Sequence, residues 1–398
     1  MATHIAVEQM IGYMYQIRYA LLLLLKSQEE ETQLCIEKFD DIALLKDNTP
    51  ELLFQTKHHL GKGGNLTNSS ADLWRTLNAW CDSIVDGKVD INNTKFIIIT
   101  TANAPQDSVA SLLRDEKYSN TVRDTKKALQ ILINTASNSE NDKHKPYYNT
   151  FISLKPEIQS KLIQNIFIFD NCDDIIETKT SIKQFIKYSS LPVYEDKIYE
   201  RLEGWWFDKV LECLCSETIK IIHKMQLRMK IADIRDEYSK DNLPIDISFE
   251  LTFSQDDLNA NERVFIEQLK LICVAKKRIN TAVRDYYRAY QQRASWVRND
   301  LIYINELENY EKKLVDEWER NFDIMCEDLE EYGDELDEKL KQSKGRTLFN
   351  TFSDKDIRIR DKCNEPFIMR GSYHILANKL KIGWHYDFEK RLCKLLNG

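Results

Sequence analysis

The chain has 398 residues, of which 42% are hydrophobic and 30% are charged, and its formal net charge is −8 at pH 7. This length excludes a single small core and predicts a folded protein of two domains. The negative net charge excludes attraction of nucleic acid by the overall field, so any DNA contact requires a local basic patch. The nine cysteines show no zinc-binding spacing, and without a secretory signal we expect reduced thiols and a cytoplasmic protein.

Residues 5–27 are expected to form the first helix, which is apolar on most of its faces. Its run from Leu21 to Leu25 is far shorter than the roughly 20 apolar residues that a membrane span needs. We therefore expect no membrane association and a helix buried against a sheet. Gln16 is a polar exception in the middle of this helix. Two interpretations of it stay open, an amide on the helix surface or a side chain at a functional site.

Residues 36–59 predict two β-strands joined by a tight turn. The apolar runs at 42–45 and 52–54 are typical of buried strands. Between them, residues 46–50 (Lys-Asp-Asn-Thr-Pro) have the composition of a turn. These features predict an antiparallel hairpin centred on Asn48.

The predicted hairpin brings three polar side chains together. It places Asp41 directly opposite Gln55 and diagonally opposite Lys57, and the last two share one face of their strand. A carboxylate binds a hard divalent cation, which polarises a phosphate and lowers the pKa of an attacking water. A nearby lysine orients that water or stabilises the charge of the transition state. We therefore expect a site for metal-assisted phosphodiester hydrolysis, with Mg²⁺ or Mn²⁺ as cofactor.

Other polar residues beside this trio are further candidates. Glu37 has the same strand parity as Asp41 and is expected to be a second metal ligand and catalytic group. Asp40 would point the opposite way in an extended strand, so it is a secondary candidate only. A solvated acidic bend is the alternative for these three carboxylates. One of the two histidines after Lys57 must share its surroundings and is a candidate for a phosphate contact. His58 is a secondary candidate for the site.

The rest of the N-terminal half alternates helices and strands. The glycine-rich residues 61–64 lack the Lys-Ser or Lys-Thr that closes a nucleotide-binding P-loop, which excludes that function. Asn68 or Ser69 is expected to cap a helix that ends near Val85. The β-branched run at 95–101 predicts a strand of a sheet covered on both faces. Further helices are expected at 108–113, 121–135 and 156–164, and a further strand at 166–170.

The C-terminal half has helical character from residue 200 onward. The segment at 245–253 predicts a strand, and residues 262–341 predict two or three long helices, the last of which (327–341) is solvated. The stretch at 286–296 is rich in aromatic and arginine residues, and a helical packing face is favoured over a nucleic-acid surface. Residues 369–388 contain two histidines beside aromatics and predict a compact docking element.

The order of motifs in the first half resembles the nuclease domain of SAVED-containing effectors of CBASS anti-phage systems. It is even more similar to the nuclease subunit of Lamassu defence systems. The motifs are GYMYQ at 12–16, Asp40-Asp41, QTKHH at 55–59 and DLWRTL at 72–77. This resemblance implies an α/β restriction-endonuclease-like fold (PD-(D/E)xK, in its QxK variant) at residues 1–195. It also points Gln16 at the active site.

Residues 369–388 resemble the C-terminal module of ABC-three-component systems, which joins an effector to an SMC-like ATPase. We therefore expect a mainly α-helical domain at 196–398 for partner docking and oligomerisation. Together the two resemblances imply a Mg²⁺-dependent DNA endonuclease that acts on phage or plasmid double-stranded DNA. They imply an SMC-like coiled-coil ATPase and a small third subunit as partners, and a homo-tetramer when active. The alternative is a non-catalytic adaptor, which the acidic net charge and the neutral Gln55 favour.

Overall fold

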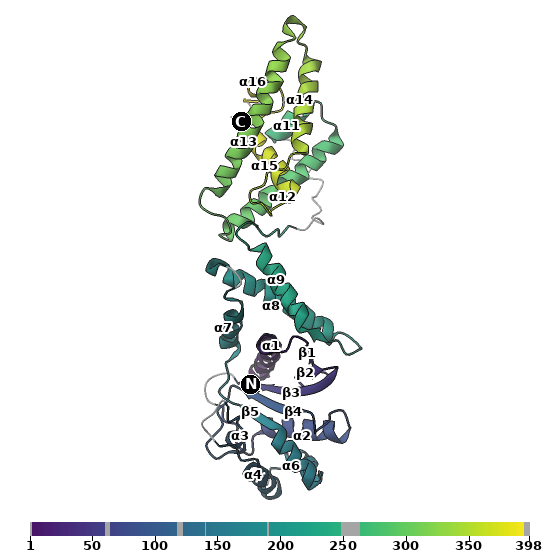
Figure 1. Cartoon of the computed structure of the whole chain (residues 1–398), viewed down its shortest axis with the longest axis vertical. Helices are drawn as coiled ribbons and strands as arrows, with labels where there is room; N and C mark the ends of the chain where they lie inside the picture. Colours follow the sequence, from purple (N-terminus) through teal and green to yellow (C-terminus); the bar gives the residue numbers. More distant parts are fainter. Residues whose placement is uncertain are drawn as a thin grey trace. The chain divides into compact units, whose positions relative to one another are not determined.

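The computed structural model describes residues 2–59, 64–117, 122–139, 141–188, 191–247 and 263–393. The chain divides into two compact units, unit 1 at residues 1–235 and unit 2 at residues 236–398 (Figure 1). Among the described residues, no helix is long and apolar enough to cross a membrane. Most of the predicted loop at 61–64 lies outside the described residues.

Unit 1 is built on a six-stranded mixed sheet with the order β5-β4-β3-β2-β1-β6. Its strands are β1 (Gln33–Ile36), β2 (Ile42–Lys46), β3 (Thr49–Lys57), β4 (Lys95–Thr100), β5 (Ile166–Phe169) and β6 (Ile222–His223). The strands β3, β4 and β5 are parallel, whereas β1 pairs with β2 and β6, and β2 with β3, in the antiparallel sense. The continuous apolar runs of β2 and β4 are buried because helices cover both faces of the sheet.

The turn between β2 and β3 contains only two residues, Asp47 and Asn48. Both have a positive φ, 49° and 63°, which a type I′ turn requires and which matches the twist of the strands. The predicted turn at 46–50 is therefore too long. Pro50 belongs to β3, where it pairs with Leu45.

A β-bulge between Leu44 and Leu45 shifts the pairing of β2 with β3 by one residue. Beyond the bulge, Ile42 lies opposite Phe54. Asp41 lies one residue before β2, and this register agrees with the predicted alignment of Asp41 with Gln55. Without the bulge, the two-residue turn would shift the pairing of β2 with β3 by one residue from the predicted register. The bulge cancels that shift.

The helices of unit 1 include two that sequence reasoning missed, α5 and α7. The set is α1 (Ala2–Lys26), α2 (Ala71–Val85), α3 (Val109–Leu112), α4 (Thr125–Asn138), α5 (Lys145–Ser153), α6 (Pro156–Asn165), α7 (Ile175–Ile186), η1 (Pro192–Tyr194), α8 (Glu195–Leu214) and α9 (Lys224–Glu237). The cap of α2 is Ser70 rather than Asn68 or Ser69, because the Ser70 hydroxyl accepts the backbone N–H of Leu73 at 3.2 Å. The observed order helix, three strands, helix, strand matches the order that the sequence predicted.

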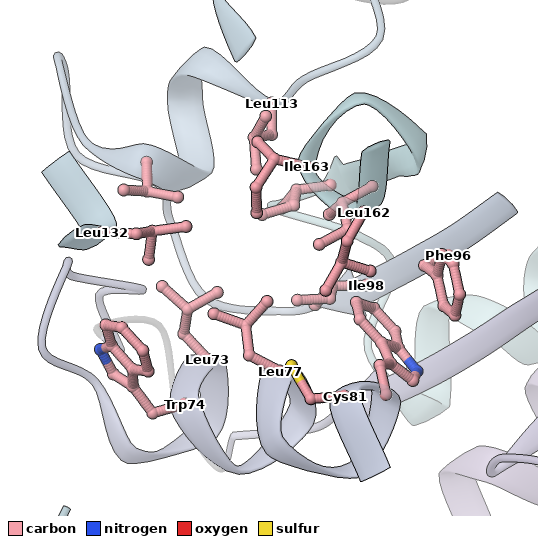
Figure 2. Close-up of a cluster of buried hydrophobic side chains, with 14 of the residues drawn as sticks. Leu73, Trp74, Leu77, Cys81, Phe96, Ile98, Leu113, Leu132, Leu162 and Ile163 are labelled. Atoms are coloured by element: carbon pink, nitrogen blue, oxygen red, sulfur yellow. The ribbon is translucent and has the colours of Figure 1, made fainter. Parts of the chain in front are cut away.

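The larger core of unit 1 lies between one face of the sheet and helices α2 to α6 (Figure 2). Leu73 and Leu77 of α2 point toward Leu132 of α4 and Ile163 of α6, whereas Trp74 packs edge-on against Tyr148 and Phe151 of α5. Helix α1 lies on the opposite face of the sheet, as Figure 1 shows, and packs on β3 and on helices α7 and α8. The buried first helix is therefore confirmed.

Helix α8 and strand β6 complete unit 1. The Trp206 indole of α8 donates to the Ile17 carbonyl at 2.7 Å, and Glu203 pairs with Arg18 at 2.5 Å. Strand β6 extends the sheet beside β1. For these reasons the division between the units falls after residue 235, whereas the predicted boundary is at 195.

Unit 2 is helical in its described part. It contains α11 (Val264–Leu271), α12 (Lys276–Arg298), α13 (Glu306–Glu330), η2 (Gly333–Glu335), α14 (Glu338–Ser353), α15 (Pro366–Asn378) and α16 (Phe388–Leu392). The predicted helix at 327–341 is wrong, because α13 ends at Glu330 and α14 begins at Glu338. The predicted strand at 245–253 is absent at 245–247, and its remainder lies outside the described residues.

The aromatic- and arginine-rich stretch at 286–296 lies on α12 and forms a packing face. Tyr286 and Trp296 are buried, and the Arg293 guanidinium is paired with Glu311 inside the unit. The two C-terminal histidines, His374 and His385, are also buried. These residues therefore stabilise unit 2 and do not form an exposed nucleic-acid surface.

Candidate active site

A solvent-open cavity of about 390 Å³ lies where α1 and α2 meet the hairpin of β2 and β3. It is lined by Gln9, Gly12, Tyr13, Gln16, Glu37, Asp41, Gln55, Thr56, Lys57, His58, His59 and Asp72. The cavity thus collects Asp41, Gln55, Lys57 and Glu37, the four residues predicted to be catalytic. Of the secondary candidates, Gln16 and His58 line it and Asp40 does not.

Asp41 is held in place by the strand opposite. Its Oδ2 accepts hydrogen bonds from the backbone N–H of Thr56 at 2.8 Å and from the Thr56 hydroxyl at 2.9 Å. Its Oδ1 forms no hydrogen bond with a described residue. The two bonds fix the carboxylate while leaving one oxygen free to bind a ligand in the cavity.

Gln16 joins the two carboxylate-bearing residues of the cavity. Its side-chain amide donates to Glu37 Oε1 at 2.9 Å and to the Asp41 carbonyl at 2.8 Å. With 4% of its surface exposed, Gln16 is buried, which excludes the interpretation as a surface amide. A glutamine serves here because its N–H₂ group donates two hydrogen bonds.

Glu37 reaches the cavity by a route that the sequence did not predict. Strand β1 ends at Ile36, and Glu37 has a left-handed backbone with a φ of 57°. Its N–H donates to the Asp40 and Asp41 carbonyls, which closes a tight bend. Strand parity with Asp41 is therefore the wrong reason for its position. Partial burial and the nearby Asp41 raise the pKa of Glu37, although the Gln16 bond opposes this.

Asp40 points away from the cavity, as expected for the neighbour of Asp41. Its carboxylate accepts from the Trp80 indole N–H at 2.5 Å and from the Asp41 backbone N–H at 3.0 Å. Burial raises the pKa of Asp40 to about 7, against the Trp80 hydrogen bond, which lowers it. Asp40 therefore supports the backbone at Asp41 from behind and is not a ligand candidate in this geometry.

Gln55 and Lys57 enter the cavity from the end of β3. The parallel neighbour β4 fixes this end, with Gln55 opposite Ile98 and Lys57 opposite Thr100. Neither the Gln55 amide nor the Lys57 ammonium forms a side-chain hydrogen bond or ion pair with a described residue. Both polar groups are thus available to a ligand.

The two histidines after Lys57 have different surroundings. His58 packs on Tyr15 with 4.9 Å between ring centroids, and its Nε2 accepts from the Ile175 N–H at 3.4 Å. Burial lowers the pKa of His58, so it is neutral near pH 7. His58 lines one wall of the cavity, but its ring is held by α1 and α7.

His59 is the histidine that shares the surroundings of Lys57, whereas sequence reasoning had chosen only His58 as a site candidate. Its Nε2 lies 3.2 Å from Asp72 Oδ2, and its backbone N–H donates to the Thr101 hydroxyl at 2.9 Å. The hydrogen bond to Asp72 raises the pKa of His59 and lowers that of Asp72. The available signal was the alternation of Gln55, Lys57 and His59, but the partner Asp72 lies thirteen residues later, beyond local spacing.

The oxygen donors of the cavity suit a hard divalent cation. Two carboxylates, Asp41 and Glu37, and the amide oxygen of Gln55 provide fewer ligands than such an ion takes. Mg²⁺ commonly accepts this arrangement because it keeps several waters. Within the described ranges, no group of three or more His, Cys, Asp or Glu side chains is placed to hold a metal.

Comparison with known proteins adds information mainly for unit 2. Residues 265–392 match the family model described as C-terminal domain 7 of the ABC-three component (ABC-3C) systems. The match confirms the resemblance seen at residues 369–388 and extends it over most of the described helices of unit 2. No curated protein matches the chain.

Solved structures similar to the chain include two receptors. The Cap4 SAVED/CARF-domain containing receptor of Moraxella osloensis is 12% identical, and the similarity covers 65% of this chain and 60% of the receptor at a TM-score of 0.35. The Cap4 receptor of Acinetobacter baumannii with the cyclic trinucleotide 3'3'3'-cAAA is 12% identical, with 65% and 57% covered and a TM-score of 0.33. The chain therefore spans about 60% of the length of the first of these structures.

Proposed function

We propose that unit 1 is a restriction-endonuclease-like domain of the PD-(D/E)xK type, in its QxK variant, and that it is a metal-dependent DNA endonuclease. The observation that carries this proposal is the meeting of Asp41, Gln55 and Lys57 in one open cavity. Each of them presents there an oxygen or nitrogen with no hydrogen bond or ion pair to a described residue. A carboxylate, an amide and an ammonium so placed suit phosphodiester hydrolysis.

In this proposal the residues of the cavity have distinct roles. Asp41 and Glu37 hold Mg²⁺ or Mn²⁺, with the Gln55 amide as a neutral ligand or water-holder. The bound ion supplies Lewis-acid polarisation of the phosphate and a water of lowered pKa. Lys57 orients the attacking water or stabilises the charge that develops on the phosphate. Thr56 and Gln16 act as positioning residues, since they hydrogen-bond the carboxylates and the backbone that carries them.

We further propose that the endonuclease is the effector of a Lamassu-type defence complex that cleaves phage or plasmid DNA in the cytoplasm. The match of residues 265–392 to a domain of ABC-three component systems supports a role for unit 2 in partner docking. The proposed partners are an SMC-like coiled-coil ATPase and a small third subunit. The proposed active form is a homo-tetramer, and native mass spectrometry with and without the partners tests it.

A non-catalytic adaptor is the second candidate function. The net charge of −8 and the limited donor set of the cavity favour it, because both weaken the binding of nucleic acid and metal. The adaptor interpretation predicts that unit 1 binds no divalent ion at the cavity. It also predicts no effect of Lys57 on the biological activity of the complex.

Metal binding separates the two functions. Calorimetric titration of the purified chain with Mn²⁺ is expected to detect binding of the ion. Asp41→Ala is expected to abolish this binding. Glu51→Ala is the matched control, because it removes an exposed carboxylate from β3 outside the cavity. An absence of binding by the wild-type chain, or equal binding by Asp41→Ala, would contradict the nuclease proposal.

A further inference from the structure

His59 and Asp72 form a hydrogen-bonded pair at the cavity to which the proposed chemistry assigns no role. The pair joins two elements, since His59 follows β3 and Asp72 lies in the first turn of α2. The Asp72 carboxylate is hydrogen-bonded to Nε2 of the His59 imidazole, while Nδ1 of the same ring has no hydrogen bond to a described residue. The His59 side chain is 37% exposed, so a ligand in the cavity can reach it.

The position of His59 along the chain sets its distance from the proposed reaction centre. Residues two apart in an extended chain are separated by about 6–7 Å. Lys57 is one such step beyond Gln55, and His59 is a second step beyond Lys57. Neighbouring phosphates along one nucleic-acid strand have a comparable spacing. If Lys57 faces the scissile phosphate, His59 faces the next phosphate rather than the same one.

The charges of the cavity create a need for a second cation there. The lining includes three carboxylates, Glu37, Asp41 and Asp72, but one lysine, Lys57. A polyanionic strand is repelled by such a wall unless cationic groups offset it. A protonated His59 supplies this cation, and Asp72 is the partner that favours the protonated form.

We propose that the His59 side chain, held by Asp72, binds the phosphate next to the scissile phosphate and so sets the register of the DNA strand over the reaction centre. This inference rests on the proposed nuclease function and deepens it. His59 is a substrate-binding residue in this account, and Asp72 is a positioning residue that acts through it.

The surroundings of His59 predict that this contact depends on pH. The groups that face it are Asp72 on α2, Glu8 on α1 and Lys57 on β3. The two carboxylates raise the pKa of His59, with the Asp72 hydrogen bond as the largest cause, whereas burial and Lys57 lower it. Because the cation is the binding form, the contact is present below this pKa and is lost as the pH rises through it.

The test measures binding separately from cleavage. The affinity of the full chain for a fluorescent DNA duplex is measured by anisotropy over a range of NaCl concentrations, with Ca²⁺ replacing Mg²⁺. Loss of one phosphate contact lowers the slope of log K against log salt by about 0.9. We expect this decrease for His59→Asn, together with a raised KM and a retained kcat when cleavage is assayed with Mg²⁺. His59→Arg restores the slope and makes binding independent of pH, because arginine stays charged.

The control is His223→Asn, an equivalent change on β6 at the far edge of the sheet from β3. It is expected to change neither the slope nor KM. If the wild-type chain binds and cleaves DNA while His59→Asn keeps the wild-type slope and KM, the inference is wrong and the nuclease proposal stands. If the wild-type chain neither binds nor cleaves DNA, the proposed function fails and this inference fails with it.

Discussion

Asp40 and Asp41 are adjacent carboxylates whose surroundings give them different properties. Asp41 faces an open cavity and keeps one oxygen free of described partners, whereas the Asp40 carboxylate accepts a hydrogen bond from the Trp80 indole. The histidines after Lys57 differ in the same way, because His58 packs on Tyr15 while the next residue forms an ion pair at the cavity. At the residue scale, position relative to the strand end decides which side chain is available for chemistry.

His374 provides a test of burial at this scale. Full burial, and to a lesser degree the neighbouring Arg370, lower its pKa from 6.5 to about 3. The unfolded chain then binds a proton that the folded chain does not, so stability is full above pH 6.5 and is lost as the pH falls. The slope is about 1.4 kcal/mol per pH unit. We expect the wild type to lose about 2 kcal/mol more than His374→Gln between pH 7 and pH 5.

Urea denaturation at the two pH values, followed through the tryptophans, measures this difference. The variant is needed because burial raises the pKa of the nearby Asp285, and this shift changes stability with pH in the opposite sense. Equal pH dependence of the wild type and the variant would contradict a buried, neutral His374.

The hairpin of β2 and β3 shows how an element positions the site. Its hydrophobic pattern predicted both strands. The assumed centre at Asn48 predicted the alignment of Asp41 with Gln55, which is the alignment that continues the observed pairing of Ile42 with Phe54. The structure reaches that register by a two-residue turn and a bulge. No local pattern in the sequence distinguishes these two routes, since Pro50 is compatible with a turn or with the start of a strand.

The left-handed backbone of Asn48 makes a prediction about this element. Its φ of 63° is tolerated by asparagine and by glycine, but a β-branched side chain clashes there. Asn48→Val is expected to lower the free energy of unfolding by about 1–2 kcal/mol. Asn48→Gly is expected to have a free energy of unfolding within a few tenths of a kcal/mol of the wild-type value. Thermal unfolding of the three proteins checks this, and a stable valine variant would exclude the two-residue turn.

Two glycines in helices predict opposite effects of the same substitution. A Cβ on Gly371 of α15 would lie 2.1 Å from the Asp285 carbonyl oxygen of α12, so the two helices would have to separate. Gly371→Ala is expected to destabilise the protein by about 1–3 kcal/mol. Gly204 of α8 has no atom within 4 Å of its Cβ position, so Gly204→Ala is expected to stabilise by about 0.5–1 kcal/mol. Chemical denaturation tests both, and a Gly371→Ala variant as stable as the wild type would contradict the close approach of α12 and α15.

At the scale of the whole molecule, composition and length predicted two parts, and the structure has two compact units. The position of the division was less accessible to sequence reasoning. Strand β6 contains only two residues, Ile222 and His223, and is too short to give a hydrophobic pattern in the sequence. Its pairing with β1 is a long-range contact, as are the bonds of α8 to Arg18 and Ile17.

Truncation tests this division. A fragment of residues 1–237 keeps α8 and β6, whereas a fragment of residues 1–195 loses both. We expect the longer fragment to unfold cooperatively. The shorter one is expected to be less stable by at least the roughly 3–5 kcal/mol that removal of a buried tryptophan such as Trp206 costs. Equal melting temperatures of the two fragments would favour the boundary at 195.

The central claim is that the cavity at Asp41, Gln55 and Lys57 hydrolyses DNA, and its most direct measurement is cleavage of supercoiled plasmid with Mg²⁺. Lys57→Ala is expected to keep the fold and to lose cleavage by about 100-fold or more, as removal of one charge-stabilising donor does in other enzymes. Lys46→Ala is the matched control, since this exposed lysine lies at the far end of β2 from Asp41. Cleavage by the wild type and Lys46→Ala with loss in Lys57→Ala is the predicted result. Full cleavage by Lys57→Ala, or none by the wild type even with the ATPase partner and DNA ends present, would contradict it.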